Sequence, residues 1–247
     1  MDSIRYAQRI QEAVLPPSIP FKNTFVLYRP KDIVSGDFYW LEETNGMELI
    51  AAVDCTGHGV PGAFLSILGQ NLLTKIVREY GILQPSEILN NLNTEIVNAL
   101  HQHSTGEEKI VNDGMDLALI NYDKNRNMLQ YAGAYNSLYL VRNGVLYETK
   151  ADRFPIGRTT SKEEKQFTNH KIEIHPGDIA YIFSDGYADQ FGGVKGKKFK
   201  SKYLKKFLQN ISSYSMDEQK QALERNLDEW KGNYSQVDDI VLIGKKF

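Results

Sequence analysis

The sequence predicts an α+β protein in which largely antiparallel β-sheets pack together and helices cover the outside. The expected order of elements is strands, two helices, many strands, two helices and one strand, which differs from the strand–helix alternation of a parallel sheet. Asn143-Gly144, between two apolar runs, is a strong signal for a β-hairpin. With 41% hydrophobic and 24% charged residues, the 247-residue chain has the composition of a globular protein with a sizeable core.

Residues 1–14 predict an amphipathic helix, because apolar side chains recur at three- and four-residue spacings until Pro16 and Pro17 end it. Two interpretations stay open. The helix packs on its own domain, or it is a linker or dimerisation helix joined to an upstream sensor domain. The second is favoured because the helix begins almost with the chain. We therefore expect a linker helix at 1–17 and one domain at 18–247.

The remaining elements follow from hydrophobic periodicity. Strands are expected at 25–28, 37–41, 48–54, 116–122, 128–134, 138–142, 145–149, 171–174, 178–185 and 239–245. Helices are expected at 61–80, with Pro61 at the first helical position, at 85–103, in a lysine-dense segment after Gly193, and at 216–230. A polar stretch at 102–112 predicts a surface loop.

Carboxylates stand at the ends of several of these strands. Asp54 ends an apolar run and is followed by a glycine-rich turn and a helix, although a buried strand end would avoid an unpartnered charge. Segments 35–38, 183–186 and 237–240 likewise set an Asp at one end of an apolar run. Carboxylate oxygens with no Cys/His cluster are the ligands that Mg²⁺ or Mn²⁺ prefers. Two such ions could activate a water and clamp a phosphoryl group for in-line hydrolysis.

The sequence gives little support for other classes of enzyme or for a protein that binds nucleic acid or membranes. The single cysteine, Cys55, has no evident activating partner, and the chain lacks a Gly-x-Ser-x-Gly elbow and a phosphate-binding Walker loop. A net charge of −2 gives no reason to expect binding to nucleic acid or an anionic membrane. The lone cysteine, the absence of a long apolar run and the polar N-terminus predict a cytoplasmic protein.

Four motifs together resemble one family. They are Ser35-Gly36-Asp37-Phe38-Tyr39, Asp54-Cys55-Thr56-Gly57-His58-Gly59, Phe183-Ser184-Asp185-Gly186 and Asp238-Asp239-Ile240. Their order and spacing resemble the SpoIIE-like (RsbU-type) bacterial branch of the metal-dependent type 2C serine/threonine protein phosphatases, the PPM family, over residues 20–247. Residues 6–16 resemble the linker that precedes such domains.

The resemblance implies a four-layer αββα sandwich of two antiparallel sheets flanked by helices, with two Mn²⁺ or Mg²⁺ ions at one edge. It implies that Asp54 bridges the ions and that the Cys55 carbonyl is a ligand. Asp185 and Asp239 complete one shell, and Asp37 ligates the other ion or holds its waters. The implied substrate is phosphoserine or phosphothreonine in a protein, often a small STAS-type anti-anti-sigma regulator of bacterial signalling.

Several residues keep two interpretations. His58 is a general acid for the leaving alkoxide or a residue that orients the Asp54 turn. Asp113 or Asp116 binds a third, weaker ion or only begins a strand. Arg29 and Lys31 are candidates for binding phosphate. The lysine-dense segment is a solvated helix face or a docking site for an acidic phosphoprotein. Its members are Lys195, Lys197, Lys198, Lys200, Lys202, Lys205 and Lys206.

Three functions compete at this stage: an active protein phosphatase, a binding module without activity, and a hydrolase of small phosphoesters. The four Asp positions are all filled, which favours an enzyme over a degenerate module. No additional small-molecule motif accompanies them, which favours a protein substrate.

Overall fold

The computed structural model describes residues 2–100, 113–157 and 165–247. The helices are α1 (Asp2–Val14), α2 (Gly59–Arg78), α3 (Pro85–Ala99), α4 (Gly186–Asp189), α5 (Ser201–Ile211) and α6 (Met216–Lys231). The strands of the first half are β1 (Thr24–Arg29), β2 (Phe38–Thr44), β3 (Met47–Cys55), β4 (Met115–Asp123), β5 (Met128–Ala134) and β6 (Leu138–Arg142). Those of the second half are β7 (Val145–Thr149), β8 (His170–Glu173), β9 (Ile179–Phe183), β10 (Phe191–Gly192), β11 (Lys197–Lys198) and β12 (Ile240–Lys246).

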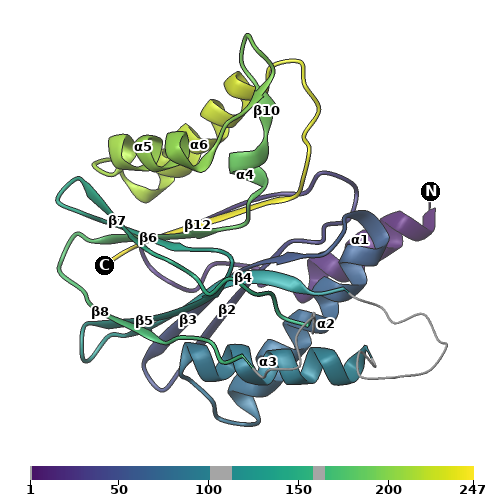
Figure 1. Ribbon diagram of the computed structural model, residues 1–247, viewed down its shortest axis with the longest axis vertical. Helices are drawn as coiled ribbons and strands as arrows, with labels where there is room; N and C mark the ends of the chain where they lie inside the picture. The colour runs from purple at the N-terminus through teal and green to yellow at the C-terminus, as the bar shows by residue number, and fades with distance from the viewer. Residues whose placement is uncertain (1, 101–112, 158–164) are drawn as a thin grey trace.

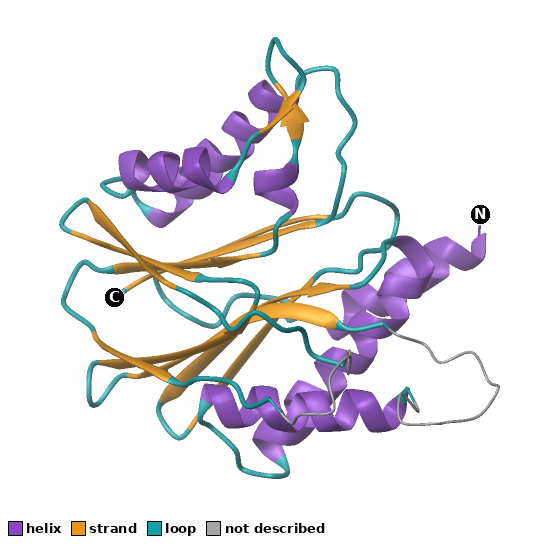
Figure 2. Cartoon of the chain, in the orientation of Figure 1, coloured by secondary structure: helices purple, strands orange, loops and turns teal. Residues whose placement is uncertain are grey.

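Two five-stranded sheets face each other, one in the order β1-β12-β9-β6-β7 and the other in the order β2-β3-β4-β5-β8. Every pair of neighbouring strands in them is antiparallel. Figures 1 and 2 show α5 and α6 on the outer face of the first sheet and α2 and α3 on the outer face of the second. The expected αββα sandwich is therefore confirmed.

Three apolar clusters hold these layers together. One fills the space between the sheets and includes Ile50, Tyr131 and Ile243. The second joins the β2–β8 sheet to α2 and α3, and the third joins the β1–β7 sheet to α4, α5 and α6. Alternate residues of β3 belong to different clusters, since Ile50 faces the other sheet and Ala51 faces the helices. The central strands are therefore buried on both faces, as their unbroken apolar runs indicate.

Some boundaries differ from those predicted. The strand expected to reach Asp185 ends at Phe183, and Asp185 instead precedes the short helix α4. Helix α2 begins at Gly59, two residues before Pro61, with His58 as its N-cap residue. Residues 101–103 of the predicted second helix and the whole of the predicted loop at 102–112 lie outside the described residues.

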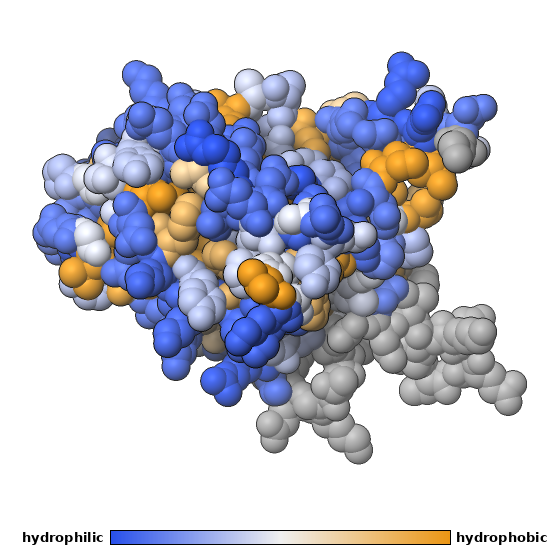
Figure 3. Space-filling model, turned by 90° about the horizontal axis from the view of Figure 1, so that it is seen from above, coloured by the Kyte–Doolittle hydropathy of each residue, from blue (hydrophilic) through white to orange (hydrophobic). Residues whose placement is uncertain are grey.

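The lysine-dense segment is not one helix. Gly193 and Gly196 have positive φ angles and turn the chain into the β10–β11 hairpin, so the first lysines lie in this hairpin and the later ones in α5. Lys198 is paired with Asp189 and Lys205 with Glu148. The interpretation of this segment as a single solvated helix face was therefore wrong. Figure 3, seen from above Figure 1, shows a mainly hydrophilic face with small separate hydrophobic patches.

In the part of the chain that the structure describes, α2 alone has the length and composition of a membrane-spanning helix. Of its most apolar stretch, 56% is buried, and Leu73 and Ile76 pack into the cluster beneath the β2–β8 sheet. A core helix of a globular domain passes the same test of length and composition, so this feature is weak evidence for a membrane span.

Candidate metal centre

The Asp54 turn and the loop before Asp37 meet at one edge of the sandwich. Asp54 is the penultimate residue of β3, and the next residues turn through Gly57, at a φ of 82°, into α2. A side chain on Gly36 would collide with the Gly57 carbonyl and come close to the Cys55 carbonyl. Glycine at position 36 is therefore what allows the two loops to touch and brings Asp37 near Asp54.

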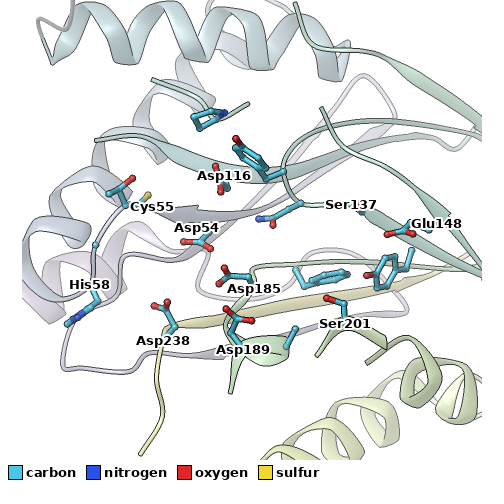
Figure 4. A pocket seen from close by; sticks show the side chains of 18 of the residues that line it. Asp54, Cys55, His58, Asp116, Ser137, Glu148, Asp185, Asp189, Ser201 and Asp238 are labelled. Carbon is cyan, nitrogen blue, oxygen red and sulfur yellow. The ribbon is translucent and has the colours of Figure 1, made fainter. Parts of the chain in front are cut away.

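A pocket of about 870 Å³ opens at this edge. Its carboxylates come from both sheets and from the loops between them. Asp54 and Asp116 are register partners on β3 and β4. Asp185 precedes α4, Asp189 is its last residue, and Asp238 precedes β12. Figure 4 shows Asp54, Asp185 and Asp238 directed into the same space, with Asp116 on the opposite wall from Asp189.

Asp37 is not among the residues that line this pocket. Its carboxylate is buried, and Oδ2 has no hydrogen-bond partner. Burial raises the pKa of Asp37 well above its usual value, and the charges of Asp239, Asp238 and Asp185 raise it further. A carboxylate with an unpaired buried oxygen is costly unless a proton or a cation neutralises it.

Asp54 is half-buried and Asp185 is exposed, but each lies close to other carboxylates. Burial raises the pKa of Asp54, and the nearby charges of Asp37 and Asp185 add to the shift. The pKa of Asp185 is raised first by desolvation and then by Asp189 and Asp238, and its carboxylate is within hydrogen-bonding reach of Asp54. Neighbouring carboxylates raise one another's pKa, and a cation between or beside them would favour their charged forms.

Asp239, by contrast, is already satisfied by the protein. Its Oδ1 accepts a hydrogen bond from the Lys31 backbone N–H, and its Oδ2 accepts one from the Gly36 N–H, both at 2.7 Å. It is buried and is not among the residues that line the pocket, whereas its neighbour Asp238 is. Sequence reasoning named Asp239 and missed Asp238, although both belong to the same motif.

His58 lies at the end of the pocket, where Figure 4 shows it away from Asp54 and Asp185. Its Nδ1 is 2.9 Å from Oδ2 of Asp32, and about half of each side chain is exposed. Cys55 is buried, and burial raises the pKa of its thiol, so the sulfur is not an activated nucleophile. Its backbone carbonyl lies near the Gly36 loop.

The two candidates for phosphate binding lie elsewhere. Arg29 forms an ion pair with Asp228 of α6 at 2.7 Å, and neither Arg29 nor Lys31 lines the pocket. The lysine that does line it is Lys205, which pairs with Glu148 at 2.9 Å and lies over the Tyr139 ring. Lys198 stands next to the carboxylates through its 2.6 Å contact with Asp189. Sequence reasoning named both lysines but only as members of a larger cluster.

The donors fit hard divalent cations. Within the described residues, no group of three or more His, Cys, Asp or Glu side chains is arranged so that it could hold a metal ion. Carboxylates repel one another without a cation, and such ions also take backbone carbonyls and waters as ligands. The unpaired oxygen of Asp37 and the close approach of Asp54 and Asp185 are the features that a divalent cation would neutralise.

This sandwich and its acidic edge define a PP2C-type serine/threonine phosphatase domain. The family model described as Stage II sporulation protein E (SpoIIE) matches residues 45–247, and the chain belongs to this family. It is thus a protein serine/threonine phosphatase, as the motifs predicted. A comparison with curated proteins gave no match.

Solved structures agree with this assignment. The SiaA-PP2C domain of Pseudomonas aeruginosa is 31% identical, with a TM-score of 0.88 over 100% of this chain and 96% of that one. The phosphatase domain of SpoIIE from Bacillus subtilis, solved with a fragment of its regulatory domain, is 20% identical, with a TM-score of 0.69 over 90% of this chain and 62% of that one. The S. agalactiae serine/threonine phosphatase is 14% identical, with a TM-score of 0.64 over 91% and 99% of the two chains. The last two similarities show the fold alone.

Proposed function

We propose that the domain at 18–247 hydrolyses phosphoserine or phosphothreonine in a protein, using two divalent cations, Mn²⁺ or Mg²⁺, and a water. The observation that carries this proposal is the buried Asp37 carboxylate, with its unpaired oxygen, beside Asp54 and Asp185. Divalent cations would neutralise these charges, and the pocket that Asp54 and Asp185 line is open to a substrate. Divalent cations in such a site lower the pKa of a water and polarise phosphoryl oxygens.

We assign Asp54, Asp185, Asp238 and the Cys55 carbonyl as ligands, with Asp37 as a ligand or as the residue that holds the ions' waters. Asp238 replaces the expected Asp239 because it faces the pocket, while both oxygens of Asp239 hold backbone N–H groups. Asp239 then acts as a positioning residue for the Gly36 loop. Asp116, opposite Asp54 in the register, is the better candidate for a third, weaker ion than Asp113, since Asp116 lines the pocket.

His58 keeps two roles. As a general acid it would protonate the leaving serine or threonine oxygen. As a structural residue it would fix the start of α2 through Asp32. Its 2.9 Å contact with Asp32 and its position as the N-cap residue of α2 favour the structural role. The test is His58→Gln: loss of the limb of the kcat pH profile that reports an essential acid supports acid catalysis, and an unchanged profile supports the structural role.

The phosphatase itself is tested with p-nitrophenyl phosphate and a phosphothreonine peptide, with Mn²⁺ titrated against EDTA. Activity should require the metal and disappear in Asp54→Asn. Calorimetry of Mn²⁺ binding to the same two proteins gives a second readout that does not depend on activity. A protein that binds no Mn²⁺ would contradict the site, whereas one that binds Mn²⁺ but hydrolyses neither substrate would be a binding module.

We propose that the enzyme acts in the cytoplasm. Its proposed substrate class is a phosphorylated regulator of bacterial signalling, such as a STAS-type domain. We propose that the exposed lysines of the lysine-dense segment, a segment whose Lys205 lines the pocket, dock an acidic phosphoprotein, for which a KM that rises with salt is the expected sign. Their exposed members include Lys195, Lys197 and Lys202. No role for nucleic acid or direct membrane contact is proposed.

We also propose that α1, as the linker at 1–17, joins two copies of the chain and receives a signal from an upstream sensor domain. Gln11 is its one buried residue, while Ile4 and Ile10 are 39% and 44% exposed. Phe64 of α2, the helix against which α1 packs, is 72% exposed. Figure 3 shows hydrophobic side chains on the side where α1 lies. Light scattering of the unmodified protein and of the double variant Ile4→Glu/Ile10→Glu tests whether α1 joins two copies. A monomer in both would contradict the dimer.

A further inference from the structure

The pocket extends well beyond the carboxylates. Away from Asp54 its lining continues over the corner between β5 and β6 to Glu148 of β7 and Lys205 of α5. Figure 4 shows Ser137 of this corner between the carboxylate group and Glu148. A pocket of about 870 Å³ is much larger than one phosphorylated side chain needs, so its far part is available to other groups of the substrate.

The corner contains a strained residue. Tyr135 has a φ of 58°, and the Asn136 N–H donates to the Ala134 carbonyl at 2.7 Å across it. This hydrogen bond between residues i and i+2 around a positive φ indicates a γ-turn of the rarer, strained form. Tyrosine is a poor choice for such a turn by conformation alone, because its Cβ makes a positive φ unfavourable.

The surrounding structure enforces this conformation. The hydroxyl of the fully buried Tyr131 donates to the Asn136 carbonyl at 2.6 Å, and the Tyr135 N–H donates to the Asp152 carbonyl at 2.9 Å. A side chain on Gly133 would collide with both the Tyr131 hydroxyl and the Asn136 carbonyl. Strained residues that are held this firmly occur mainly at functional sites.

Both side chains of the turn are suited to contact a ligand. Tyr135 lines the pocket, yet the residue is 52% exposed, so its ring is not part of the core. Asn136 also lines the pocket and is only 9% exposed, and its amide nitrogen has no hydrogen-bond partner. Buried donors of this kind are normally satisfied, by protein, water or ligand.

We propose that the Tyr135–Asn136 turn is a substrate-recognition element for a polypeptide. The Tyr135 ring packs against the chain next to the phosphorylated residue, and the Asn136 amide donates a hydrogen bond to a substrate oxygen. A tyrosine ring gives a large contact area with little loss of side-chain freedom on binding. This inference rests on the proposed phosphatase function and adds to it a preference for a peptide over a small phosphoester.

The experiment compares kcat/KM for a phosphothreonine peptide with kcat/KM for p-nitrophenyl phosphate in the Mn²⁺-loaded protein. Tyr135→Gly removes the ring and relieves the positive φ. The peptide-to-small-ester ratio should fall about tenfold, while Tm rises by about 2–4 °C. Tyr135→Phe keeps the ring and should keep the ratio. Asn136→Ala should lower the ratio without lowering Tm.

Matched controls separate recognition from general effects. Asn143→Gly relieves a positive φ of 51° outside the pocket and should leave the ratio unchanged. Tyr147 lies outside the pocket and is 54% exposed, so Tyr147→Ala removes a comparable ring. This variant should also leave the peptide-to-small-ester ratio unchanged. A ratio unaltered in Tyr135→Gly would overturn the inference. An unmodified protein that hydrolyses neither compound would instead refute the proposed function.

Discussion

The side chain of Gln11 binds the backbone of Ser35 through both of its polar atoms. Its Nε2 donates to the Ser35 carbonyl at 2.6 Å, and its Oε1 accepts from the Ser35 N–H at 3.0 Å. The same Nε2 is 2.8 Å from the Ser66 hydroxyl of α2. The next residue, Gly36, donates its N–H to Asp239. Helix α1 is thus joined directly to the loop that precedes Asp37.

Gln11→Ala should therefore affect both stability and metal binding. The change leaves the N–H and C=O of Ser35 buried without partners, which costs about 1–3 kcal/mol in the free energy of unfolding. Mn²⁺ affinity should fall because the Gly36 loop loses its support. Denaturant unfolding and calorimetry measure the two effects. Gln8→Ala, which removes only an exposed contact with Glu12 in the same helix, is the control. Equal Mn²⁺ affinity in both variants would rule out the coupling.

Adjacent aspartates should respond in opposite ways. Asp238→Asn should lose Mn²⁺ binding with little change in metal-free stability, because the side chain faces the pocket. Asp239→Asn should lower stability by about 1–3 kcal/mol, since the carboxylate accepts hydrogen bonds from two backbone N–H groups. Chemical unfolding in EDTA and calorimetric titration with Mn²⁺ distinguish them. The reverse pattern would restore Asp239 as the ligand.

Removing the metal should make stability depend on pH. Burial and neighbouring charges raise the pKa of Asp37 and Asp54 in the folded state above about 3.9, the value expected after unfolding. The folded protein then holds protons that the unfolded chain releases. This stability is fully present below about pH 4 and is lost as the pH rises through the folded pKa values. Bound Mn²⁺ replaces the protons.

The measurement is Tm against pH in EDTA and in Mn²⁺. In EDTA, Tm should fall as the pH rises above the unfolded pKa of about 3.9 and through the raised folded pKa values, and the fall should be smaller in Asp54→Asn. At an excess of Mn²⁺ near 100 times its Kd, the unmodified protein should gain about 2.7 kcal/mol, and Asp54→Asn should gain much less. A Tm in EDTA that does not change with pH would contradict the buried charge cluster.

Asp178 should give the opposite pH dependence. Burial alone would raise its pKa, but hydrogen bonds from Arg142 and from the His175 N–H, together with the Arg142 charge, hold it below its usual value. Its contribution to stability is present above the unfolded pKa, near 3.9, and is lost as the pH falls through the folded value. Arg142→Met should cost about 2 kcal/mol at pH 7 and less near pH 2. A cost that is equal at both pH values would exclude this role.

The sequence predicted the sandwich because its main signals are local. The apolar run at 49–53, the hairpin at Asn143-Gly144 and the helical spacing of α2 each specify one element. Asp54 was predictable because a charge follows directly after a buried strand. The sequence could not predict whether Asp238 or Asp239 is the ligand. That choice depends on which side chain of the segment before β12 faces the pocket, and this is decided by tertiary structure.

Two further residues were beyond sequence reasoning for related reasons. Gln11 lies among apolar residues in α1, and only its contact with Ser35, 24 positions away, gives it a role. Tyr135 adopts a backbone conformation that usually indicates glycine or asparagine, so its type concealed the turn. The sequence wrongly predicted one helix for the lysine-dense segment. Its helix-forming residues outnumber Gly193 and Gly196, the two glycines that bend the chain into a hairpin.

The pairing of β1 with β12 has a consequence for biosynthesis. All six residues of β1 have register partners in β12, from Thr24 opposite Lys245 to Arg29 opposite Ile240. A ribosome makes β12 more than 200 residues after β1, so closure of this sheet is a long-range event that slows folding. The Asp37 loop also needs Asp239 for its anchor. We therefore expect a nascent chain to gain phosphatase activity only after β12 has left the ribosome and paired with β1.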